Sequence, residues 1–113
     1  MAPITATMTE RRSERRYATT ATRWQPEALL RPGIPVVVLN ISAHGVLFES
    51  AVRLRPGVRT EIQMVTEDRR TSVRGHLVRC QVFGLGPLRY RGVLMFDELV
   101  DIDLPHQEKQ EKG

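Results

Sequence analysis

The feature that most restricts the fold of this chain is a series of short apolar runs separated by turns that contain glycine and proline. Residues 35–39 are apolar throughout and rich in valine, and residues 60–64 alternate between polar and apolar side chains. Alternation indicates a half-buried β-strand, whereas a short continuous run indicates a strand that is buried on both sides or curled into a barrel. No segment carries a convincing helical period longer than one or two turns.

These runs predict strands or extended segments at residues 27–31, 35–39, 45–50, 60–64, 72–83 and 88–96, and Gly75 suggests a bulge or bend in the fifth of them. A chain of 113 residues has room for one domain. We therefore expect an all-β fold, a small six-stranded antiparallel β-barrel, because closure removes the exposed strand edges. Residues 1–10 are expected to be disordered, 11–104 to form the barrel domain with a flexible N-terminal arm at 11–17, and 105–113 to be a flexible tail.

Composition excludes several classes of protein. No apolar run approaches the ~20 residues of a membrane-spanning helix, so we expect no insertion into a membrane. The single cysteine, Cys80, has no partner for a disulfide and no clustered histidines for a metal site, which favours a reducing cytoplasmic location and predicts no metal and no cofactor. The N-terminus lacks the pattern of a secretory signal. No catalytic triad, carboxylate pair or phosphate-binding loop is evident, so we expect no enzymatic activity.

Arginines are concentrated just before the first predicted strand. Residues 11–16 read Arg-Arg-Ser-Glu-Arg-Arg and contain two overlapping Arg-x-x-x-Arg pairs, Arg11 with Arg15 and Arg12 with Arg16. Guanidinium groups match phosphate oxygens and the O6/N7 edge of guanine two atoms at a time, so an anionic ligand is expected. A solvated basic tail, or a non-specific contact with nucleic acid, is the alternative interpretation of such a run.

A second pattern lies between two predicted strands. Residues 40–45 read Asn-Ile-Ser-Ala-His-Gly, which has the form Asn-x-Ser-x-x-Gly. Asn40 offers both a donor and an acceptor to a base edge, and Gly45 permits a positive φ and close approach of a ligand. By itself the pattern is also compatible with an ordinary turn built by Asn and Ser side chains.

The two patterns in this order resemble those of the PilZ domain, over roughly residues 11–99. That resemblance implies a six-stranded barrel that binds cyclic di-GMP through the arginine pair and through Asn40, Ser42 and Gly45. Arg12 and Arg16 match the family's arginines best, and Arg11 and Arg15 are the alternative register. The resemblance further implies that the arginines contact guanine and phosphate while the Asn and Ser side chains hold a guanine.

On this basis we expect a cyclic di-GMP receptor that changes conformation on binding and signals to a partner protein. The alternatives are a small barrel that binds single-stranded nucleic acid and a PilZ-like adaptor that binds no ligand. The aromatic content of 5% provides few stacking platforms and disfavours nucleic acid. The downstream partner, the oligomeric state and the number of ligands bound do not follow from the sequence.

Overall fold

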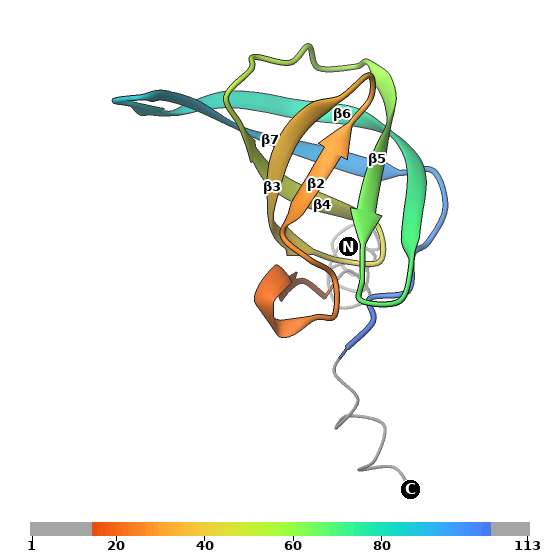
Figure 1. The fold of residues 1–113 in the computed structure, drawn as a ribbon. Coiled ribbons are helices and arrows are strands. Elements are labelled where there is room, and N and C mark those ends of the chain that lie inside the picture. The colour runs from red at the N-terminus through yellow and green to blue at the C-terminus, as the bar shows by residue number, and fades with distance from the viewer. Residues whose placement is uncertain (1–14, 105–113) are drawn as a thin grey trace, which may run out of the picture.

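The computed structural model describes residues 15–104, which form seven β-strands and one short 3-10 helix (Figure 1). In chain order these are β1 (Tyr17–Ala18), η1 (Thr19–Ala21), β2 (Glu27–Leu30), β3 (Ile34–Ile41), β4 (Gly45–Ser50), β5 (Arg59–Val65), β6 (Arg70–Leu85) and β7 (Leu88–Phe96). The strands predicted at 45–50 and 88–96 have the expected bounds, and the others are longer or shorter by a few residues. No helix in the described part of the chain is long and apolar enough to cross a membrane.

Six of the strands close into an antiparallel barrel, which confirms the predicted fold class. The strand order is β3-β2-β5-β6-β7-β4, and β4 pairs again with β3 to complete the ring. The two-residue strand β1 pairs with the end of β3, at Asn40 and Ile41, on the edge that β2 occupies at residues 34–37. The predictions of disorder at residues 1–10 and of a flexible tail at 105–113 lie outside the described residues.

The barrel interior is filled by side chains that alternate along each strand. Phe48, Ile62 and Leu94 are completely buried at its centre, and Trp24 closes one end with 3% of its surface exposed. Within residues 34–38 only Val36 and Val38 are buried. The apolar run at 35–39 is therefore a barrel strand with one buried face.

The bends in the long strand β6 differ from the sequence-based expectation. Gly75 pairs regularly with Phe96, and the register shifts fall instead between Leu77 and Arg79 and between Val82 and Gly84. Gly75 is needed for another reason, since a Cβ there would collide with the backbone of β7 at Met95. The glycine thus marks close packing of two strands and not a bulge.

Candidate functional site

A β-bulge in β3 decides which way Asn40 points. Val38 pairs with Phe48, but the next pair is Asn40 with Leu47, so Leu39 is an extra residue in the strand. Without it, the alternation that buries Val38 would also turn the Asn40 side chain inward. The bulge reverses the alternation, so that Ile41 is fully buried and Asn40 lies on the half-exposed outer side. A bulge that re-aims a polar side chain is a common device at functional sites.

The turn after β3 is closed from within by Ser42. Its hydroxyl accepts hydrogen bonds from the backbone N–H groups of His44 at 3.1 Å and Gly45 at 3.2 Å. Only 1% of Ser42 is exposed. We expected this hydroxyl to hold a guanine, but in this structure both of its close contacts are to the turn. Ser42 therefore acts here by shaping the turn that follows Asn40.

Gly45 is required by packing against β7 and not by an unusual backbone angle. Among the described glycines, Gly33 and Gly57 have a positive φ and Gly45 does not, so the positive φ that a glycine permits is not used at Gly45. A Cβ at Gly45 would lie 3.2 Å from the Cα of Met95 and would collide with the carbonyl oxygen of Leu94. The close approach that this glycine permits is therefore to the neighbouring strand.

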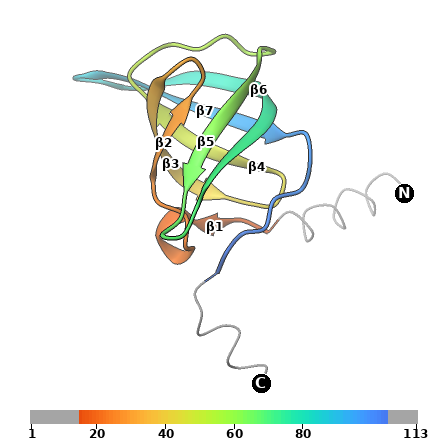
Figure 2. The ribbon, with the colours of Figure 1, turned by 45° about the vertical axis from the view of Figure 1, so that its right-hand side comes forward.

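The end of the N-terminal arm is anchored directly beside the turn. Tyr17 pairs with Ile41 and Ala18 pairs with Asn40, which makes β1 a short extension of the sheet next to β3. The buried hydroxyl of Thr19 then donates to the carbonyl oxygen of Val38 at 2.7 Å. Figure 2 shows β1 crossing the lower end of the barrel. No sequence pattern distinguishes Thr19, because it lies in a stretch that is rich in threonine and alanine.

Arg16 and Asn40 come together in one site. A terminal guanidinium nitrogen of Arg16 donates to Oδ1 of Asn40 at 2.9 Å, although the two residues are 24 positions apart in the chain. The Arg15 guanidinium lies 5.8 Å from the centre of the Tyr17 ring. No ion pair between described residues involves Arg15 or Arg16. The other two predicted arginines, Arg11 and Arg12, lie outside the described residues.

The C-terminal segment passes along the same turn. The backbone N–H of Phe96 donates to the carbonyl oxygen of His44 at 2.7 Å, and that of Val100 donates to Ala43 at 2.9 Å. Val100 and Ile102 pack against the core. The turn that carries Ser42 is thus hydrogen-bonded to the C-terminal segment, residues 96–104.

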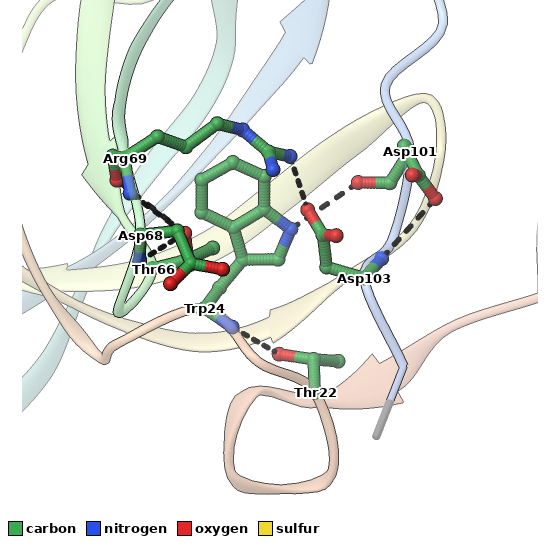
Figure 3. Close-up of polar contacts among 7 residues, drawn as sticks. All are labelled: Thr22, Trp24, Thr66, Asp68, Arg69, Asp101 and Asp103. Atoms are coloured by element: carbon green, nitrogen blue, oxygen red, sulfur yellow. Dashed lines mark hydrogen bonds and ion pairs between the residues drawn. The ribbon is translucent and has the colours of Figure 1, made fainter. Parts of the chain in front are cut away.

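A cluster around Trp24 fastens this segment to the base of the arm (Figure 3). The indole Nε1–H donates to the carbonyl oxygen of Asp101 at 3.2 Å. Arg69 lies over the indole, 5.4 Å from its ring centre, and pairs with the carboxylate of Asp103. No sequence pattern points to this role of Arg69, because neither the indole nor the carboxylate is close to it in the chain.

Another arginine-lined surface is less suited to an anion. An open groove of about 640 Å³ is lined by Arg31, Arg59 and Arg74. Arg31 and Arg74 both pair with Glu61, and Arg59 pairs with Asp97. Each of these guanidinium groups already has a carboxylate partner, and two of them share Glu61. Among residues 15–104 no group of three or more His, Cys, Asp or Glu side chains is arranged to hold a metal ion.

Comparison with known proteins gives one relevant likeness, and it concerns the fold. No family model matches the chain, and no curated protein matches its sequence. Among solved structures, the chain is similar to the Bacillus subtilis inhibitor of motility (MotI/DgrA), with a TM-score of 0.53 and 15% sequence identity. The match covers 78% of this chain and 44% of that protein, so the chain spans less than half of its length.

Proposed function

We propose that this chain is a cyclic di-GMP receptor of the PilZ type, which acts by binding and not by catalysis. The observation that carries the proposal is the hydrogen bond from Arg16 to Asn40, because it joins the two sequence patterns in a single site. Cyclic di-GMP offers two phosphodiesters and two guanine bases. Guanidinium groups recognise both kinds of group, and an amide side chain reads a base edge.

In the proposed complex, Arg16 and Asn40 exchange their mutual hydrogen bond for contacts with the ligand. The Asn40 side-chain NH₂ donates to no described residue in this structure and is available for a guanine acceptor. Arg12, the partner of Arg16 in the Arg-x-x-x-Arg pair, contributes the second guanidinium group. Ser42 and Gly45 hold the turn, and through it the position of Asn40.

The same site suggests how binding is transmitted. Among the described residues, the arm joins the barrel through the two residue pairs of β1 and the hydrogen bond from Arg16, so a ligand that draws Arg16 away from Asn40 acts directly on that attachment. A protein partner in the cytoplasm then recognises the altered arm and the adjoining surface. In this proposal the barrel itself stays unchanged.

Isothermal titration with cyclic di-GMP tests the proposal. Each hydrogen bond to a charged group contributes about 1.5–3 kcal/mol, so Arg16→Ala should weaken binding roughly 30-fold. Asn40→Ala should weaken it as well, and Arg12→Ala/Arg16→Ala should abolish measurable binding. Arg53→Ala, which removes one exposed arginine from the β4–β5 loop, is the matched control and should bind like the wild type.

Two results would overturn the proposal. One is the absence of binding heat from folded wild-type protein. The other is binding of single-stranded oligonucleotides with a steep dependence on salt and with no preference for the cyclic dinucleotide, which would assign the arginines to nucleic acid.

A further inference from the structure

Strands β6 and β7 continue beyond β5 as a ribbon, residues 78–91, of which the outer part, residues 83–89, is two-stranded. β5 accompanies β6 only as far as His76, and β4 accompanies β7 only as far as Tyr90. Beyond these points the two strands pair with each other alone, out to Leu85 opposite Leu88. Figures 1 and 2 both show the ribbon projecting from the barrel, away from the end that carries β1.

Exposed apolar side chains gather on this ribbon. Of the ten large hydrophobic side chains that are exposed among the described residues, five belong to it: Val78, Val82, Phe83, Leu85 and Leu88. These side chains are 45% to 82% exposed, and the most exposed of them is Leu85 at the tip. The turn at the tip, Gly86-Pro87, carries no charge. The tip of the ribbon is therefore apolar.

The apolar side chains lie on both faces of the ribbon. Leu85 pairs with Leu88, and Val82 pairs with Tyr90, which shares the face of the buried Leu94 by alternation along β7. Phe83 is on the opposite face, because its ring lies 3.6 Å from the guanidinium of Arg91, which pairs with Glu49 on the outside of the barrel. An environment that surrounds the tip would cover all of these side chains.

The charge of the ribbon has one sign. Residues 69–96 contain six arginines and no aspartate or glutamate, and Arg79, Arg89 and Arg91 belong to the ribbon. Arg89 lies opposite Gly84, one residue back from the tip, and Arg79 lies farther back opposite Val93. No ion pair between described residues involves Arg79 or Arg89. The apolar tip is thus followed along the ribbon by the positively charged side chains of Arg89 and Arg79.

We propose that the tip of this ribbon binds peripherally to the surface of an anionic lipid bilayer. Leu85, Leu88 and Phe83 enter the boundary between headgroups and acyl chains, and Arg89 contacts lipid phosphates, while Arg79 adds positive charge farther back on the ribbon. Basic side chains next to exposed leucine and phenylalanine are the combination that holds a protein at a membrane interface. A search for long apolar runs does not detect such a site, because the apolar tip is short: Leu85 and Leu88 flank a turn of only two residues.

A lipid surface fits these observations better than a protein partner. A projecting, narrow tip with apolar groups on both faces requires a partner that encloses it, and a fluid interface does so without a preformed cleft. Protein interfaces instead bury an apolar centre inside a polar rim on one face. The proposal is independent of the cyclic di-GMP site, which lies at the other end of the barrel.

Sedimentation with lipid vesicles tests the inference on the full chain. Wild-type protein should sediment with vesicles of phosphatidylcholine and phosphatidylglycerol, and much less with phosphatidylcholine alone. Leu85→Ser/Leu88→Ser keeps every arginine, and it should lower the partition coefficient roughly tenfold for each leucine. The matched control is Leu29→Ser/Leu99→Ser, because these leucines are 42% and 71% exposed elsewhere on the molecule, against 47% and 82% for Leu88 and Leu85.

The contribution of Arg79 and Arg89 is tested separately. Arg89→Ala should weaken binding to anionic vesicles about fivefold, and Arg79→Ala should weaken it less because Arg79 lies farther from the tip. Circular dichroism and thermal melting confirm that each variant is folded. The inference is overturned if the wild type binds no vesicles, if Leu85→Ser/Leu88→Ser binds them as the wild type does, or if the control pair is equally impaired. Loss of a defined protein interaction in Leu85→Ser/Leu88→Ser, without vesicle binding by the wild type, would assign the ribbon to a protein instead.

Discussion

Replacing Gly45 by alanine tests why the Asn-x-Ser-x-x-Gly pattern ends in glycine. A Cβ at this position would meet only backbone atoms of β7, at Leu94 and Met95. β7 is held by β4 on one side and β6 on the other, so it cannot retreat without disturbing both pairings. Inserting one methyl group into a well-packed interior costs about 1–3 kcal/mol. For a domain of this size, each 1 kcal/mol lowers Tm by about 4–8 °C, so we expect a decrease of about 10 °C.

Urea unfolding followed by the fluorescence of the single tryptophan, Trp24, measures this effect. The midpoint should fall while the m-value stays unchanged. Gly84→Ala is the matched control, because the atom nearest to its added Cβ is 3.8 Å away, and its unfolding free energy should stay within about 0.5 kcal/mol of the wild type. If Gly45→Ala is as stable as the wild type but loses cyclic di-GMP binding, the glycine serves the ligand, and the argument from strand packing is wrong.

Three further variants separate the roles of the neighbouring residues. Ser42→Ala leaves two turn N–H groups without their acceptor and should lower the free energy of unfolding in urea by about 1–3 kcal/mol. It should weaken cyclic di-GMP binding less than Asn40→Ala does. A larger loss of affinity would show that the serine contacts the ligand. Thr19→Val removes the hydroxyl that donates to a carbonyl oxygen of β3 and should also lower the free energy of unfolding by about 1–3 kcal/mol. Thr20→Val, at the adjacent exposed position, should change stability little. Equal effects of the two substitutions would contradict a role for the buried hydroxyl. Arg69→Ala removes the cation above the indole and should change the emission of Trp24 in the folded protein, and an unchanged spectrum would refute that contact.

The fold class and the two site patterns could be read from the sequence, because both depend on neighbouring residues. Alternation at residues 60–64 and the glycine- and proline-containing turns indicated strands and their ends, and closure followed from the need to remove free edges. The pairing of an arginine cluster with Asn40 was a hypothesis about two distant segments. The structure brings Arg16 of that cluster to Asn40, while Arg11 and Arg12 lie outside the described residues.

Only the tertiary structure decided how each of these residues is used. The bulge at Leu39 turns Asn40 outward, and the sequence does not reveal it, because residues 35–39 are apolar throughout and the extra residue appears only in the pairing with β4. The burial of Ser42 and the collision at Gly45 depend in the same way on atoms contributed by other segments. The pattern of side chains along the chain specifies strands and turns, because these depend on residues that are neighbours in the sequence. Orientation and close packing depend on which strands lie side by side, and that is settled when the barrel closes.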